Sequence, residues 1–299
     1  MNRIAAGCFA LLVGIAPLRA VVIYGGDGTA NTTAPTDNPG WENVGSIGGA
    51  TGVYIGNEWV LTATHVGSGD ITLGGITYAA VAGSGVQVAG DLYAFRIASD
   101  PFLPSLKLAA VTPSAGTSVI MVGNGLNRAA TQTTWYVDTS PTPNVWNTSL
   151  FIGFDASVKG YRYGSGSAKR WGTNTVDQVI TYDVGTGITM GIQVSFGATP
   201  GDAQGAGGDS GGAMFIKTDG TWELAGILSG IGTFNGQPSA AVLGNLTYAV
   251  DLATYASQLS TVMGLNEPAA IPEPAASAAG FGLSALGLVV WRSRRQRRS

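Results

Sequence analysis

Cysteine, histidine and charge are all scarce in this sequence of 299 residues. The single cysteine, Cys8, lies in the first ten residues, so the body of the chain cannot form an internal disulfide. With one histidine, His65, a zinc site built from cysteine and histidine ligands is also excluded. Packing and hydrogen bonds must therefore hold the fold together.

Charged residues make up 11% of the chain and are unevenly distributed. Residues 21–270 carry 8 basic and 17 acidic side chains, a net charge of −9, whereas arginines crowd the last eight positions. An acidic body repels phosphate backbones, so we expect no nucleic acid partner.

The composition predicts an all-β body. The chain contains 46 glycines, and short runs rich in Val, Ile, Thr and Tyr alternate with turn-forming residues. Asp251 is expected to cap one short helix over residues 252–263. Residues 156–175, where Gly and Ser mix with basic and aromatic residues, are expected to form an exposed loop. Strands are expected over residues 21–24, 52–55, 58–63, 71–73, 77–80, 91–97, 118–123, 133–138, 150–154, 176–183, 188–196, 212–216 and 222–229, with a last one that ends near 248–250.

The first twenty residues have the pattern of a secretory signal peptide. A basic start is followed by an apolar stretch and by Leu18-Arg19-Ala20, which predicts cleavage after Ala20. A lipoprotein signal at Cys8 is the alternative. It is disfavoured because the apolar stretch mostly follows the cysteine instead of preceding it.

The C-terminal segment, residues 266–299, combines three features. Ile271-Pro272-Glu273-Pro274 is followed by an apolar run over residues 275–291 and then by an arginine-rich end, Arg292 to Ser299. A plain tail anchor is one interpretation, since the run is near the lower limit for a membrane span. The order of the features resembles the PEP-CTERM tails of Gram-negative bacteria. That resemblance implies export across the inner membrane, transient membrane insertion, and removal of the tail by an exosortase-type enzyme, leaving the body on the cell surface or in the extracellular matrix.

The stretch Gly207 to Gly212 surrounds a serine, Ser210, with small residues. Such a turn exposes the hydroxyl and lets backbone N–H groups converge on one point, so it can hold a nucleophile. A glycine-rich surface turn is the alternative. The catalytic interpretation requires a general base and an acid that orients it.

His65 is the only candidate for the base, and it follows an apolar strand directly. The best candidate for the orienting acid is Asp91, at the head of another apolar strand. Asp70 and Asp100 compete with it, but the first sits in a glycine-rich turn and the second precedes a proline.

These residues together resemble the trypsin/chymotrypsin-like serine proteases. The resemblance covers about residues 45–263. The stretches that carry it are Leu61-Thr62-Ala63-Thr64-His65, Asp91 to Ile97, Gly208-Asp209-Ser210-Gly211-Gly212 and the possible substrate strand Gly226 to Gly230, in that order. It implies two packed antiparallel β-barrels and a short C-terminal helix within residues 21–265. The N-terminal barrel would cover about residues 45–112 and the C-terminal barrel about 113–250.

The resemblance also implies the chemistry of an exported serine endopeptidase, a monomer without cofactor or metal that acts on proteins or peptides through an acyl-enzyme. Ser210 would be the nucleophile, His65 the general base and Asp91 its orienting acid, with the N–H groups of Gly208 and Ser210 as the oxyanion hole. The substrate-binding residues would be Gln204, Ser229 and Gly230. Gln204 at the pocket base does not favour Lys or Arg in the substrate, although Asp202 lies close in sequence.

The sequence departs from the family pattern in two places. Val66 stands where many members have a cysteine. Many members also release an Ile-Val-Gly-Gly terminus whose amine pairs with the acid before the serine. Here Val21 to Gly26 is only similar, so Asp209 would pair either with an amine released at Val21 or with an internal donor. Two rival functions remain: an inactive surface or matrix-binding protein with this fold, and an esterase using the same site.

Overall fold

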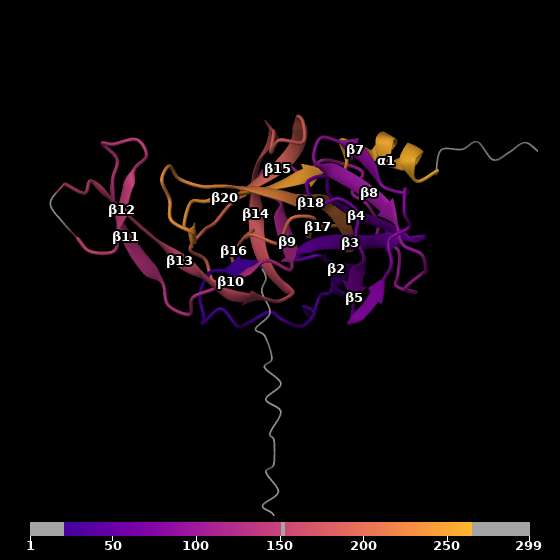
Figure 1. Cartoon of the computed structure of the whole chain (residues 1–299), viewed down its shortest axis with the longest axis horizontal. Helices are drawn as coiled ribbons and strands as arrows, with labels where there is room; N and C mark the ends of the chain where they lie inside the picture. The colour runs from indigo at the N-terminus through magenta and orange to yellow at the C-terminus, as the bar shows by residue number, and fades with distance from the viewer. Residues whose placement is uncertain (1–20, 151–152, 265–299) are drawn as a thin grey trace, which may run out of the picture. The chain divides into compact units, whose positions relative to one another are not determined.

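The computed structural model describes residues 21–150 and 153–264. Nearly all of its regular structure is β (Figure 1), which confirms the predicted fold class. The predicted signal segment and C-terminal tail lie outside the described residues. Within the described part of the chain, no helix is long and apolar enough to cross a membrane.

The first half of the body forms a curled antiparallel sheet of seven strands. Its core contains Val60, Ile71 and Phe95, each fully buried. Nearly every residue of its central strands, residues 50–56 and 59–63, is buried, so these strands are covered on both faces. In spatial order the strands are β6 (Ile76–Tyr78), β5 (Ile71–Leu73), β2 (Val44–Ile47), β3 (Ala50–Gly56), β4 (Trp59–Ala63), β8 (Leu92–Arg96) and β7 (Val86–Ala89). A 3₁₀ turn, Trp41–Asn43, leads into β2.

The second half forms a closed six-stranded barrel. Met121, Ile192 and Met214 are fully buried inside it. Two barrels were expected. In the C-terminal one the strands pair all the way round through hydrogen bonds, whereas the N-terminal one is the curled sheet, which does not close in this way. Around the barrel the strands are β14 (Arg170–Tyr182), β15 (Thr189–Ser195), β20 (Leu246–Asp251), β18 (Thr221–Gly232), β17 (Ala213–Thr218) and β9 (Ser118–Gly123).

A further sheet projects from the barrel (Figure 1). Its small core centres on Trp135, which packs edge-on against Trp146 at 6.4 Å between ring centroids. The strands are β10 (Leu126–Arg128), β13 (Ala156–Ser167), β11 (Thr133–Asp138) and β12 (Val145–Asn147), and β19 (Ala240–Val242) also pairs with β13.

The prediction of an exposed loop over residues 156–175 was wrong, because these residues belong to β13 and β14. Tyr161 is 4% exposed, and β13 pairs with both β11 and β19. The strand expected over residues 150–154 lies partly outside the described residues, and Gly153 is in a turn.

The first residues of the described chain form a separate two-stranded sheet, and Val21 and Ile23 pack into the barrel core. β1 (Val22–Ile23) pairs with β16 (Ala203–Gln204), with Val22 opposite Gln204. Val21 and Val22 are each 1% exposed. The start of the body is therefore held against the strand that leads into the Ser210 turn.

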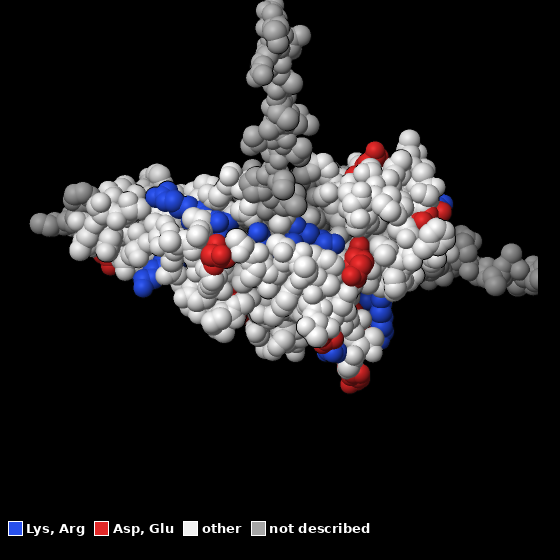
Figure 2. Space-filling model, turned by 90° about the horizontal axis from the view of Figure 1, so that it is seen from below, with Lys and Arg blue, Asp and Glu red and all other residues white. Residues whose placement is uncertain are grey.

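The C-terminal helix, α1 (Ala256–Val262), is shorter than the expected span of residues 252–263. Leu252 donates its N–H to Ala225, and Asp251 accepts the hydroxyl proton of Thr254, so residues 252–255 form turns instead. On the face seen in Figure 2, most of the surface is uncharged, as the low charge content predicts, and some of the Lys and Arg side chains lie in a row across the middle.

Candidate active site

The pairing of two strands brings His65 to Asp91. β4 and β8 are antiparallel neighbours with Ala63 opposite Leu92. The residues just after β4 therefore meet the residue just before β8. The Nδ1 atom of His65 lies 3.0 and 2.9 Å from the two carboxylate oxygens of Asp91, and the backbone N–H of His65 donates to the same carboxylate at 3.2 Å.

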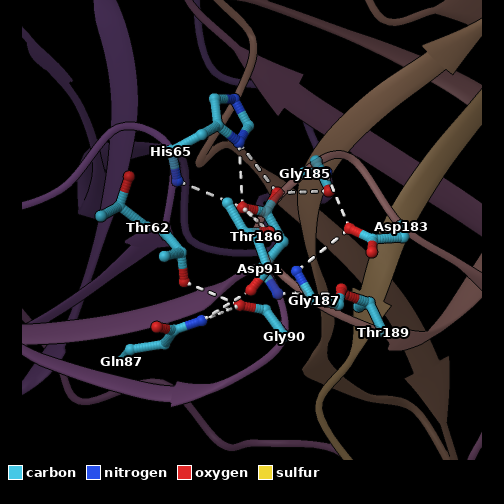
Figure 3. Close-up of polar contacts among 12 residues, drawn as sticks. Thr62, His65, Gln87, Gly90, Asp91, Asp183, Gly185, Thr186, Gly187 and Thr189 are labelled. Carbon is cyan, nitrogen blue, oxygen red and sulfur yellow. Dashed lines mark hydrogen bonds and ion pairs between the residues drawn. The ribbon is translucent and has the colours of Figure 1, made fainter.

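Asp91 is completely buried and is held from both halves of the molecule (Figure 3). Thr186, in the turn between β14 and β15, donates its hydroxyl to Asp91 Oδ1 at 3.2 Å, and Ser229 on β18 donates to Oδ2. The Asp91 N–H donates to the Thr189 hydroxyl at 3.0 Å. A carboxylate with this many donors keeps one orientation toward the imidazole.

The two groups shift each other's pKa. The hydrogen bond to Asp91 raises the pKa of His65, against the opposing effect of burial. Burial alone would raise the pKa of Asp91, but the hydrogen bonds from His65 and Ser229 outweigh it and hold that pKa below its usual range. Near neutral pH Asp91 is thus ionised, and His65 directs its Nδ1 proton to Asp91. This leaves Nε2 as the proton acceptor.

The turn that carries Ser210 is clamped between the two halves. Thr51 on β3 donates its N–H to the carbonyl of Ser210 at 2.9 Å, and Gly211 donates to the carbonyl of Leu228 on β18 at 2.7 Å. Gly211 has φ +85°, and a Cβ there would lie 2.0 Å from the carbonyl oxygen of Thr51. Only glycine fits at this position.

Ser210, His65 and Gly208 border one cavity of about 660 Å³. Within the described chain, no hydrogen bond joins the Ser210 hydroxyl to His65, and such bonds are often long before substrate binds. The N–H groups of Gly211 and Gly212 bond to backbone carbonyls, whereas those of Gly208 and Ser210 have no acceptor among the described residues. These two N–H groups are the predicted oxyanion donors.

Asp209, next to Ser210 in the sequence, does not line the cavity that Ser210 shares with His65, and it is 2% exposed. Its two oxygens accept the N–H groups of Gly125 at 2.6 Å and Ala206 at 2.8 Å. Burial raises its pKa to about 7, and the nearby charge of Arg170 only partly offsets this. Both hydrogen-bond donors to the Asp209 carboxylate within the described chain are internal backbone groups.

The three predicted substrate-binding residues do not all line the same cavity. Ser229 and Gly230 border a smaller cavity beside Ser210. Ser229 has a second contact that the sequence does not suggest, the hydrogen bond to Asp91. Gln204 is completely buried on β16, and the cavity lining begins one residue later, at Gly205.

Thr186 and Thr189 were missed in the sequence, since each lies more than ninety positions after Asp91. The turn that presents Thr186 is built by Asp183, whose Oδ1 accepts the N–H groups of Gly185 at 2.7 Å and Gly187 at 3.0 Å (Figure 3). The Asp-Val-Gly-Thr-Gly sequence signals a tight turn, but nothing local connects it to the acid.

Replacing Thr186 with valine should lower kcat roughly tenfold, the effect expected for one hydrogen bond to a charged group. The valine side chain has nearly the same shape but cannot donate to Asp91. Steady-state kinetics will measure kcat and KM separately, and KM should change little. Thr186→Ser, which keeps the hydroxyl, should restore the rate; equal activity in the valine variant would contradict this role.

The closed barrel and the curled sheet define the chymotrypsin-like fold class. In this fold His65 pairs with Asp91 and borders one cavity together with Ser210. The family model described as Trypsin matches residues 30–252, well over half of the chain. The chain therefore belongs to the trypsin family of proteases.

Solved structures of low sequence identity resemble this one. The M. tuberculosis H37Rv protein Rv3671c, in an inactive mutant form, is 16% identical over 83% of this chain and 99% of its own, with a TM-score of 0.48. The HtrA-type protease AlgW, solved with a decapeptide, is 15% identical over 72% of this chain and 51% of its own, with a TM-score of 0.44. Comparison with curated proteins finds no match. The family assignment rests on the family match alone.

No group of three or more His, Cys, Asp or Glu side chains that could hold a metal ion occurs in the described residues.

Proposed function

We propose that the protein is an exported serine endopeptidase with Ser210 as nucleophile. One observation carries the proposal: His65, which is hydrogen-bonded to Asp91, borders the same cavity as Ser210, next to two N–H groups that have no acceptor among the described residues. Export is supported by the signal-like first twenty residues.

In the proposed reaction His65 Nε2 takes the proton of the Ser210 hydroxyl as its oxygen attacks a peptide carbonyl. The oxyanion that forms accepts the N–H groups of Gly208 and Ser210. Asp91 stabilises the imidazolium through Nδ1, and the proton then passes to the leaving amine. Water, activated by His65 in the same way, releases the acyl group from Ser210.

An alkyl fluorophosphonate tests this proposal directly. The Ser210 oxygen would bond to phosphorus with loss of fluoride, and mass spectrometry of the digested protein would locate the adduct. We expect one adduct, on Ser210, which is lost in His65→Ala and after denaturation. An unmodified Ser210 in the folded protein would favour the inactive-protein alternative.

A further inference from the structure

A second, smaller cavity of about 100 Å³ opens beside Ser210. One wall is the segment leading to the nucleophile, and the other consists of β18 and its neighbour β20. Ser210 lines both this cavity and the larger one, so a substrate with its carbonyl at Ser210 can place a side chain in this space. The residues around it are Gly205, Ala206, Gly207, Asp209, Ser210, Leu228, Ser229, Gly230, Ile231 and Thr247.

Two side chains limit the space opposite Gly205. Ile231 on β18 and Thr247 on β20 are directly paired, so both point to the same face. A Cβ placed on Gly205 would lie 3.0 Å from the Thr247 methyl carbon and 3.5 Å from Ile231 Cγ2. Both side chains thus reach across to the opposite wall.

The hydroxyl oxygen of Thr247 already has a hydrogen-bond partner. Its hydroxyl accepts the N–H of Gly205 at 2.9 Å, and the residue is 2% exposed. The methyl group is therefore the part of Thr247 that meets the space beside Gly205. Ile231 is 38% exposed and forms the rim. Aliphatic groups thus limit the cavity both inside and at its entrance.

Among the described residues that line this cavity, Asp209 is the one acid, and it is 2% exposed, so a basic substrate side chain meets no accessible carboxylate. Both oxygens of Asp209 accept backbone N–H groups, from Gly125 and Ala206. Asp202 borders a different groove, where its carboxylate accepts the N–H of Thr199. A Lys or Arg side chain would lose its hydration here without gaining an ion pair, which is strongly unfavourable.

Size excludes aromatic side chains as well, because a cavity that holds a benzene ring measures roughly 150 Å³. Building on the protease function proposed above, we propose that this cavity receives the substrate side chain on the acyl side of the scissile bond and selects small aliphatic residues, alanine and valine. Ile231 and Thr247 are the residues that set this limit.

Five quenched peptides that differ only at the residue before the cleaved bond test the proposal: Ala, Val, Leu, Phe and Lys. We expect kcat/KM for Ala and Val to exceed that for Phe and Lys by at least about tenfold. Cleavage sites will be checked by mass spectrometry, with Ser210→Ala as the blank. Preference for Lys or Phe would overturn the inference and leave the protease function intact, whereas no Ser210-dependent cleavage of any peptide would overturn both.

The residue assignment is tested by Ile231→Ala, which should raise kcat/KM for Leu relative to Val by about tenfold. Thr247→Ser removes the methyl group, keeps the hydroxyl that bonds Gly205, and should shift the preference in the same direction by less. The matched control is Ile76→Ala, since Ile76 is 61% exposed on β6 and lines neither cavity. An unchanged profile in folded Ile231→Ala would contradict the assignment.

Discussion

Replacing Ser210 with alanine will abolish turnover, with a fall in kcat of about 10⁶-fold. The loss is this large because the hydroxyl is the proposed site of the covalent bond, and no other group can form the acyl-enzyme. The fold should persist, since the contact that holds this residue is its backbone carbonyl on the Thr51 N–H, which alanine retains. Peptide hydrolysis and thermal unfolding, measured on the same preparation, will check both statements.

Ser68→Ala is the matched control, because Ser68 is an exposed serine on the same cavity. It should hydrolyse peptide at close to the original rate. Hydrolysis by Ser210→Ala at the rate of the unaltered protein would refute the assignment of the nucleophile.

Replacing Asp91 with asparagine should lower kcat about 10⁴-fold. An asparagine presents either a weaker acceptor or an N–H donor to His65 Nδ1, so it no longer favours the tautomer that leaves Nε2 free. It also removes the charge that stabilises the imidazolium. Asp100→Asn is the control, because Asp100 accepts the Tyr54 hydroxyl and the Phe102 N–H, away from the imidazole.

The pH profile separates this role from a merely structural one. His65 must be neutral to accept a proton, so activity falls as pH drops through its pKa, which the hydrogen bond to Asp91 raises above the ordinary value for histidine. In Asp91→Asn the acid limb should move to lower pH, since the raising hydrogen bond and charge are gone. A low rate with an unshifted acid limb would contradict the proposed coupling.

The three site residues could be predicted because each sits in a short local pattern. His65 ends an apolar strand, Asp91 heads another, and Ser210 lies among glycines. The choice of Asp91 over Asp70 also depended on strand position, and in the structure Asp70 instead accepts the N–H of Ala80 at 3.0 Å. A site residue can be predicted from its neighbours in sequence where its position at the end of a strand determines the direction of its side chain.

Features that depend on distant partners could not be predicted in this way. Nothing near Thr186 in sequence indicates that its hydroxyl meets Asp91. Residues 156–175 were misjudged for a related reason, since their glycines and serines suggest a loop until β11 and β9 are seen to pair with them. The closing of the smaller cavity by Ile231 and Thr247 likewise follows from pairing between two strands, not from either strand alone.

The pairing of β1 with β16 bears on how the chain reaches its native state. Val21 and Ile23 lie in a core otherwise made from residues 109–249, so the first residues of the body are buried by strands made much later. Contacts between such distant segments are slow to form, because loop-closure entropy is lost before they stabilise anything. Val21, Val22 and Ile23 therefore stay exposed until residues 109–249 are available to bury them. Over that interval this apolar run is a site for aggregation or for a chaperone.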